Sequence, residues 1–217
     1  MSKKKRILLE LYRRLYDSFG PRHWWPADSP FEVIVGAILT QNTAWRNVEK
    51  AITSLKSLGL MSPEAIYNLP VRDLALIIKP SGYYNIKARR LKHFVEFLFA
   101  DTGGDLKRLF DQELDPLRRK LLSINGIGPE TADSILLYAG EKPTFVVDTY
   151  TRRILMRHLL LPEDASYDET RDLFMSHLEP CVSMFNEYHA LLVKLGHTFC
   201  LKRNPRCQDC PVKGLNE

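Results

Sequence analysis

Apolar residues recur at intervals of three and four along most of the chain, which is the period of amphipathic helices. In the segment 85–100, one face carries Ala88, Leu91, Phe94, Val95 and Leu98. A capping residue followed by proline marks several helix starts, at Ser29-Pro30, Ser62-Pro63 and Asp115-Pro116. The pattern predicts roughly ten helices joined by short loops.

Strand signals are nearly absent from the same pattern. Only the run 144–147 resembles a strand, and it is too short to seed a sheet. We therefore expect an all-α fold. No segment approaches membrane-spanning length, and Arg13 and Arg14 interrupt the first apolar run, unlike in a signal peptide. These features predict a soluble intracellular protein without a membrane partner.

Composition and charge narrow the class of partner. The 217 residues are 45% hydrophobic, enough to build one large domain or two small ones. The net charge is only +5, but lysine and arginine are clustered. Such clusters suit a polyanion, although each one alone is more commonly a solvated helix face. The clusters include 3–6, 87–90, 118–120, 152–153 and 202–206.

The segment 121–132, LLSINGIGPETA, places two glycines between two predicted helices. Gly126 and Gly128 can take positive φ and allow close approach to a ligand, while the helix that begins at Pro129 offers free N–H groups to an anion. A lone pair of glycines would indicate an ordinary helix hairpin. The whole pattern, with an apolar residue between the glycines and Thr131 followed by alanine, favours a hairpin that binds a DNA phosphate.

Asp148 ends an apolar run and opens the next predicted helix. Its local sequence indicates an N-cap aspartate, and a helix N-terminus also stabilises an ionised carboxylate. Near the C-terminus, Cys200, Cys207 and Cys210 have spacing typical of thiolate metal ligands rather than of a disulfide framework. Cys181 is set apart, because a predicted helix carries it roughly 20 Å or more from Cys200.

The hairpin and the segment Val146-Val147-Asp148-Thr149 resemble the helix-hairpin-helix DNA glycosylase superfamily, especially its endonuclease III branch. The segments 38–43 and 82–88 and the cysteine tail follow in the family's order, so the resemblance covers most of the chain. It implies a two-lobed all-α fold. The implied division is a six-helix barrel at 30–139 with the hairpin at 116–139, and a second lobe from 1–29 and 140–217 with a cysteine loop at 200–210.

The resemblance implies a catalytic role for Asp148, beside the C1′ atom of a flipped nucleotide. A carboxylate there stabilises an oxocarbenium-like transition state and orients the attacking water. Members that also cut the strand carry a lysine two residues after the second hairpin glycine, where this chain has Glu130. Because a carboxylate cannot form a Schiff base, the resemblance predicts a monofunctional glycosylase.

Trp24-Trp25-Pro26 resembles a segment of a small group of 3-methyladenine glycosylases within the same branch. This likeness implies that the flipped base stacks between Trp24 or Trp25 and Trp45, where a cationic purine gains cation–π attraction. Paired tryptophans are more commonly core packing. Two alternatives stay open: an endonuclease III-like glycosylase and lyase for damaged pyrimidines, and a non-catalytic damage-binding protein.

The resemblance also implies DNA contacts. Gln41 and Tyr83 match positions from which family members fill the gap left by a flipped base, although locally they would equally cap a helix end and pack. In relatives, the loop after the first cysteine presents basic residues to DNA. The expected DNA contacts are Gln41, Tyr83, Lys87, Gly126, Gly128, Thr131, Lys202 and Arg203.

The three cysteines match the first three ligands of the family's [4Fe–4S] loop, and Asn216 stands where the fourth cysteine is expected. The resemblance favours a three-cysteine [4Fe–4S] cluster, with zinc or no metal as alternatives. We expect a monomer of the cytoplasm, associated with the nucleoid, that acts on double-stranded DNA containing a damaged base.

Overall fold

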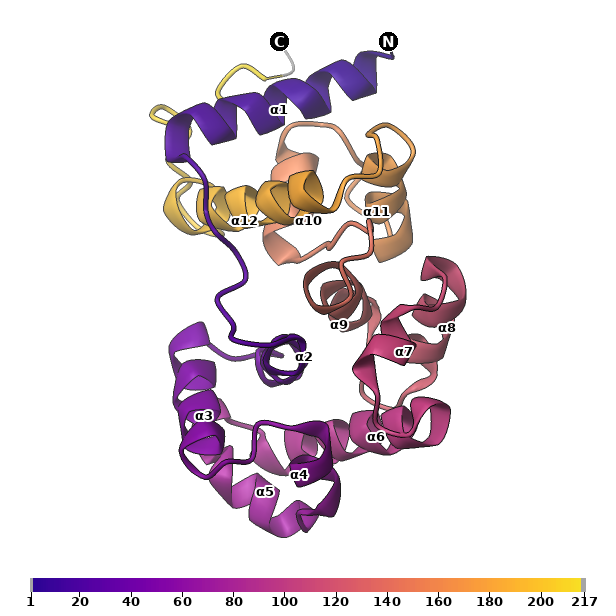
Figure 1. The fold of residues 1–217 in the computed structure, drawn as a ribbon. Helices are drawn as coiled ribbons and strands as arrows, with labels where there is room; N and C mark the ends of the chain where they lie inside the picture. The colour runs from indigo at the N-terminus through magenta and orange to yellow at the C-terminus, as the bar shows by residue number, and fades with distance from the viewer. Residues whose placement is uncertain (1, 216–217) are drawn as a thin grey trace. The chain divides into compact units, whose positions relative to one another are not determined.

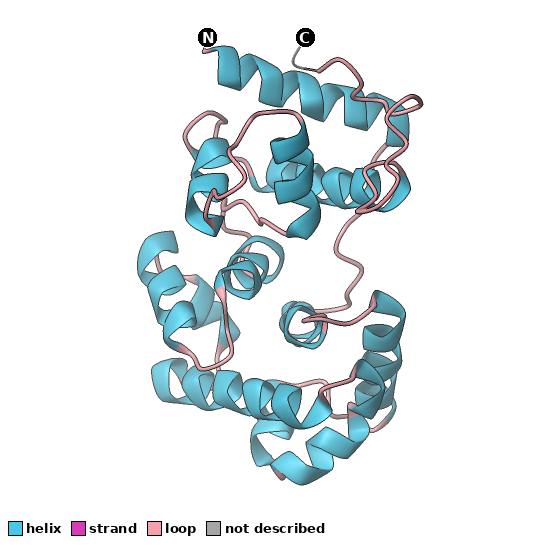
Figure 2. Ribbon diagram, turned by 180° about the vertical axis from the view of Figure 1, so that it is seen from behind, coloured by secondary structure: helices cyan, strands magenta, loops and turns pink. Residues whose placement is uncertain are grey.

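The computed structural model describes residues 2–215, and Asn216 lies outside the described residues. The chain divides into two compact units. We call Ala27–Lys142 the central unit, and Met1–Pro26 together with Pro143–Glu217 the terminal unit. All regular structure from residue 2 to residue 215 is helical, without a strand (Figure 2). The run 144–147 is buried coil. The all-α prediction is confirmed.

The central unit is built around α2 (Pro30–Leu39), which is seen end-on in Figure 1. Its residues from Phe31 to Leu39 are all buried. This helix packs against α3, α6, α9 and η2. Ser29 accepts a hydrogen bond from the Glu32 N–H, as predicted for an N-cap. The other elements are α3 (Trp45–Ser57), α4 (Pro63–Asn68), α5 (Val71–Ile77), η1 (Lys79–Ser81), α6 (Tyr84–Thr102), α7 (Leu106–Phe110), α8 (Leu114–Ser123), α9 (Pro129–Ser134) and η2 (Ile135–Ala139), a π-helical turn.

The terminal unit contains α1 (Lys3–Phe19), α10 (Thr149–Arg157), α11 (Tyr167–Met175) and α12 (Val182–Thr198). Helix α12 packs against α1 and α10. An aromatic cluster forms the core, where Phe145 stacks on Phe174 at 3.6 Å between ring centroids and meets Phe185 and Tyr188 edge-on. The coil before α10 is thereby fixed, and Asp148 stands at its end.

One helix start differs from its prediction. Helix α8 begins at Leu114 with Glu113 as N-cap, so Asp115 lies in the first turn instead of capping it. Aspartate is favourable both as an N-cap and in the first turn, where it interacts with the helix dipole. The pair Asp115-Pro116 therefore indicated a helix start without fixing its exact residue. None of the helices described between residues 2 and 215 is long and apolar enough to cross a membrane.

Candidate active site and DNA-binding hairpin

The two hairpin glycines serve different purposes in the turn between α8 and α9. Gly126 has φ +94°, and a Cβ there would lie 2.3 Å from Cγ of Arg90. Gly128 has φ −88°, is the N-cap of α9, and a Cβ there would meet nothing within 4 Å. The turn thus needs Gly126 for its backbone and packing. Gly128 keeps the exposed first turn of α9 open to a ligand.

A buried ion pair joins the two helices of the hairpin. Arg118 on α8 donates two hydrogen bonds to Asp133 on α9, at 3.0 and 3.1 Å. Asp133 is fully buried. Two parallel bonds from one guanidinium fix both distance and orientation, so the pair sets how the helices flank the turn. Sequence reasoning missed this pair, because neither residue belongs to the glycine motif.

Gln41 connects the end of α2 to the hairpin. Its Nε2 donates to the Gly126 carbonyl at 3.1 Å and to Oγ1 of Thr131 at 2.8 Å. Arg90 of α6 donates to its Oε1. The structure therefore brings together three of the predicted DNA-contacting residues, Gln41, Gly126 and Thr131, and adds Arg90, which the sequence analysis named only as part of the basic cluster 87–90.

Lys87 does not occupy the surface position that a phosphate contact requires. Its side chain is 1% exposed, and its ammonium donates to the carbonyls of Leu39 and Ser81, each at 2.7 Å. Burial and the charge of Arg90 lower the pKa of Lys87 to about 8. The prediction that Lys87 binds DNA is wrong: it ties the end of α2 to the loop before α6.

Tyr83, the predicted DNA-contacting residue in the loop before α6, is strongly exposed to solvent. It is 69% exposed and adopts a left-handed backbone conformation with φ 46°. Gly82 before it also has positive φ, at 65°. Two successive residues of this kind turn the chain sharply before α6 begins at Tyr84. Tyr83 therefore projects from a tight turn.

Asp148 is the N-cap of α10 and is 9% exposed. Its Oδ1 accepts a 2.7 Å hydrogen bond from the Thr151 N–H, as the capping prediction requires. Its Oδ2 lies 3.6 Å from Nε2 of His189 on α12. Burial raises the pKa of Asp148, but His189 and the Thr151 N–H outweigh burial and bring the pKa below its usual value. The site holds an ionised, buried carboxylate.

The predicted base-stacking tryptophans belong to different units. Trp24 and Trp25 lie in the terminal unit, half-buried, with ring centroids 5.4 Å apart and planes at 64°. Trp45 is the first residue of α3 in the central unit and donates from Nε1 to Glu49 at 2.9 Å. The structure brings Trp24 and Trp25 together as an aromatic pair. Their stacking with Trp45 stays a prediction.

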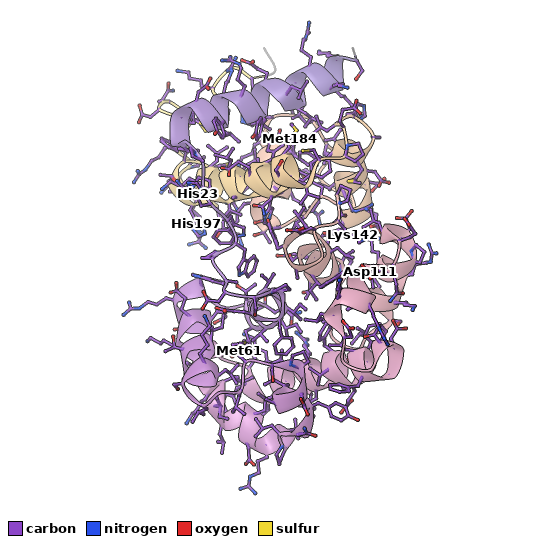
Figure 3. All side chains as sticks on the ribbon, viewed as in Figure 1. His23, Met61, Asp111, Lys142, Met184 and His197 are labelled. Carbon is purple, nitrogen blue, oxygen red and sulfur yellow. The ribbon has the colours of Figure 1, made fainter. Side chains whose placement is uncertain are left out.

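A second aromatic group adjoins Asp148. The Tyr150 ring lies 4.5 Å from the ring of His197, between centroids, and the Arg153 guanidinium lies 5.0 Å from the Tyr150 ring centroid. His197 lies near the end of α12 (Figure 3). The sequence analysis did not single out this group, although Tyr150 stands two residues after the predicted catalytic aspartate.

The three C-terminal cysteines line one hollow of about 420 Å³. Cys200 is buried, Cys210 half-buried and Cys207 exposed. Within the described part of the chain, no three His, Cys, Asp or Glu side chains come close enough together to hold a single metal ion. Thiols distributed around one hollow suit a polynuclear iron–sulfur group better than one zinc ion, so this donor set fits the former. Cys181 stands apart at the start of α12.

Two arginines of α10 fix the backbone of the cysteine loop. Arg153 donates to the carbonyls of Cys200 at 2.8 Å and Gly196 at 3.3 Å. Arg157 donates to Sγ of Cys200 at 3.3 Å and to the next two carbonyls at 2.7 and 3.2 Å. The loop that follows exposes Lys202 and Arg203. Glu130, at the predicted lyase position, is exposed in the first turn of α9.

Comparison with known proteins defines the class. Residues 35–180 match the family described as HhH-GPD superfamily base excision DNA repair protein. The chain is 44% identical over 211 residues to MJ1434 of Methanocaldococcus jannaschii, a protein assigned as a DNA repair glycosylase. The match covers 97% of this chain and 96% of that protein. It is 29% identical over 207 residues to endonuclease III of Thermotoga maritima, covering 95% and 91%.

Solved structures agree with this family. The Helicobacter pylori 3-methyladenine DNA glycosylase MagIII bound to 1,N6-ethenoadenine matches with a TM-score of 0.75 and 27% identity, over 89% of this chain and 97% of that one. A non-covalent endonuclease III–DNA complex matches with a TM-score of 0.81 and 22% identity, over 99% and 95%, and shares the fold.

This chain belongs to the HhH-GPD superfamily of DNA glycosylases. It is a DNA repair glycosylase and therefore acts on DNA. Both the resemblance inferred from the sequence and the helix-hairpin-helix glycosylase fold are confirmed.

Proposed function

We propose that this chain is a monofunctional glycosylase that hydrolyses the N-glycosidic bond of a flipped alkylated purine, foremost 3-methyladenine. The observation that carries the proposal is Asp148, an ionised carboxylate buried at the start of α10 with one oxygen held by the Thr151 N–H. Such a group stabilises the positive charge that develops on the sugar as the base departs, and it orients the attacking water.

The lysines support hydrolysis without strand cleavage. Glu130 replaces the lysine that would attack C1′, and a carboxylate forms no Schiff base. Lys87 has a pKa lowered to about 8, as a nucleophilic lysine requires. However, Lys87 is 1% exposed and donates to two backbone carbonyls, so it is not accessible to a nucleotide.

The tryptophans support a cationic base as substrate. N3-methylated adenine carries positive charge and has a weakened glycosidic bond, so aromatic faces select it without strong acid catalysis. In the proposed pocket, Trp24 or Trp25 stacks on one side of the base and Trp45 on the other. MagIII, named as a 3-methyladenine glycosylase, is 27% identical to this chain, which supports the same substrate class.

In the proposed complex, a monomer binds double-stranded DNA with both a barrel lobe at 30–139 and a second lobe formed by 1–29 and 140–217. Tyr83 acts as the wedge in the space left by the flipped base, and Gln41 replaces lost hydrogen bonds. The backbone around Gly126, Gly128 and Thr131 holds one phosphate. Lys202 and Arg203, both exposed, contact others.

The proposal includes a [4Fe–4S] cluster held by Cys200, Cys207 and Cys210, with a structural role. When bound, it would stiffen the loop that carries Lys202 and Arg203. Iron and sulfide analysis of anaerobically purified protein tests this, with about four irons per chain expected. The variant Cys207→Ser should lose iron, whereas Cys181→Ser should retain it. Stoichiometric zinc, or no metal in the wild type, would contradict the proposal.

The decisive test is base release from methylated duplex DNA, with chromatographic identification of the product. Wild type should release 3-methyladenine, and Asp148→Asn should lose release by about a thousandfold or more while still binding DNA. Incubation with borohydride should trap no adduct. Release that survives in Asp148→Asn would refute the role of this carboxylate.

Similarity to endonuclease III of T. maritima over nearly the whole chain supports a second candidate function, that of a glycosylase and lyase for damaged pyrimidines. Release of thymine glycol or uracil together with a borohydride-trapped adduct would favour it and remove the case for the tryptophan pocket. A protein that binds abasic or alkylated duplex DNA but releases no base, with Asp148→Asn binding like wild type, would instead be a damage-binding module.

A further inference from the structure

We infer that His189 is a positioning residue for the reaction: it orients the Asp148 carboxylate through the second oxygen and keeps that carboxylate ionised. The inference rests on the proposed role of Asp148 and adds to it a residue outside the hairpin and outside the segment around Asp148. His189 comes from α12, 41 residues further along the chain, and is 6% exposed.

The two carboxylate oxygens have different neighbours. Oδ1 is bound by the Thr151 N–H at 2.7 Å, a contact that the backbone of α10 provides by itself. Oδ2 lies 3.6 Å from Nε2 of His189. One donor leaves a carboxylate able to rotate about its Cβ–Cγ bond, whereas a second group on the other oxygen fixes the plane of the carboxylate. The Thr151 N–H and His189 together thus fix the orientation of the Asp148 carboxylate.

The close packing of α10 and α12 makes this contact possible. Gly196 lies seven residues, or about two helical turns, after His189 and so shares its face of α12. A Cβ at Gly196 would lie 2.3 Å from Cδ1 of Tyr150, so only glycine allows the first turn of α10 to approach this closely. The approach that brings Tyr150 against Gly196 also brings Asp148 against His189.

Electrostatics gives His189 a second effect on Asp148. Burial raises the pKa of this carboxyl, and the proximity and charge of His189 are the largest opposing influences. Without His189, burial would dominate and the carboxyl would take up a proton at higher pH. A neutral carboxylic acid cannot stabilise a developing cation. Loss of His189 should therefore move the acid limb of the rate profile to higher pH.

The tyrosines and the arginine around the pair do not titrate in the same range. From α10, Tyr150 interacts electrostatically with Asp148, Arg153 lies over the Tyr150 ring, and burial raises the pKa of the Tyr150 phenol further. From α1, Tyr12 contacts Tyr188, the residue before His189, and burial raises its pKa as well. Tyrosines stay neutral and arginine stays charged between about pH 5 and 8. From α12, His197 packs on the Tyr150 ring, so a limb shift that is absent from His197→Gln reports on the Asp148–His189 pair.

The test compares His189→Gln with His189→Leu, because both side chains fill similar space but only glutamine can donate a hydrogen bond. Single-turnover base release is measured from about pH 5 to 8, together with affinity for duplex DNA carrying an abasic-site analogue. His189→Leu should lose about tenfold or more in rate at pH 7, or ~1.4 kcal/mol of barrier, with little change in affinity. His189→Gln should recover part of the rate.

In both variants the acid limb should move to higher pH, further in His189→Leu than in His189→Gln. His177→Ala, in the terminal unit but away from Asp148, serves as control and should keep the wild-type profile. Equal rate losses in the two variants with an unmoved limb would show a merely structural histidine. If His189→Leu does not fold, a wild-type limb in His189→Gln alone overturns the inference. Activity that survives in Asp148→Asn overturns the proposed function instead.

Discussion

Substitution of Gly126 by alanine should destabilise the protein through two separable effects. At φ +94° an L-residue adopts a disfavoured conformation, which costs about 1–2 kcal/mol. The new Cβ would also lie 2.3 Å from Cγ of Arg90, and such overpacking costs about 1–3 kcal/mol. Displaced Arg90 would lose its hydrogen bond to Gln41. The expected total is about 2–5 kcal/mol, with a fall in Tm of roughly 4–20 °C for a chain of this size.

Two other glycines separate these effects. Gly59 also has positive φ, at 69°, but a Cβ there meets nothing within 4 Å, so Gly59→Ala should cost only the backbone strain. Gly128 has neither positive φ nor a close neighbour, so Gly128→Ala should cost about 1 kcal/mol or less through the weaker N-cap. Thermal unfolding followed by circular dichroism measures all three.

The order of stability distinguishes packing from strain. The expected loss increases from Gly128→Ala to Gly59→Ala to Gly126→Ala. If Gly126→Ala costs no more than Gly59→Ala, then Arg90 adapts freely and its contact with the turn does not constrain the hairpin. The same variants bear on DNA binding in a different order, because Gly128→Ala should weaken phosphate binding while leaving the fold nearly intact.

Three further predictions follow from buried or clamped side chains. Asp133→Ala strands its arginine partner on α8 and should cost about 3–5 kcal/mol in denaturant unfolding, whereas Glu179→Ala, in an exposed pair, should cost about 1 kcal/mol or less. The folded pKa of Lys87, about 8, lies below its unfolded value near 10.4, so the unfolded chain binds more protons between these two pH values. The free energy of unfolding should therefore rise with pH in that range. Lys87→Met should abolish the rise, and an unchanged dependence of unfolding free energy on pH would contradict the burial of Lys87. Arg157→Ala removes three hydrogen bonds from the loop 200–206, so trypsin should cleave this loop faster than in wild type, and equal rates would show that other contacts hold the loop.

Local signals in the sequence predicted much of the fold. Capping at Ser29 and Asp148 was anticipated correctly, because an N-cap depends on residues within one helical turn. The turn at Gly126 was predicted for the same reason, since glycine between two helical patterns indicates a turn from local sequence alone. These features gave the all-α class and the approximate position of the hairpin.

Long-range contacts were not predictable in the same way. Gln41 meets Gly126 across 85 residues, and no local pattern encodes that pairing. His189 reads as one polar residue within an apolar helix. Lys87, by contrast, carried a signal that was overlooked: it stands four residues before Leu91 and seven before Phe94, on the buried face of α6. Its charge suggested a surface role, and the helical period should have outweighed it.

The tight turn at Tyr83 has a consequence for how quickly damage could be recognised. The buried Lys87 ammonium donates a hydrogen bond to the Ser81 carbonyl, and Gly82 and Tyr83 have positive-φ conformations in the folded protein. In the proposed wedge role, the backbone at Gly82 and Tyr83 therefore loses little conformational entropy when the ring enters DNA, because folding has already fixed it. Tyr83 would probe each base step as a preorganised group, with the DNA rather than the enzyme supplying the motion.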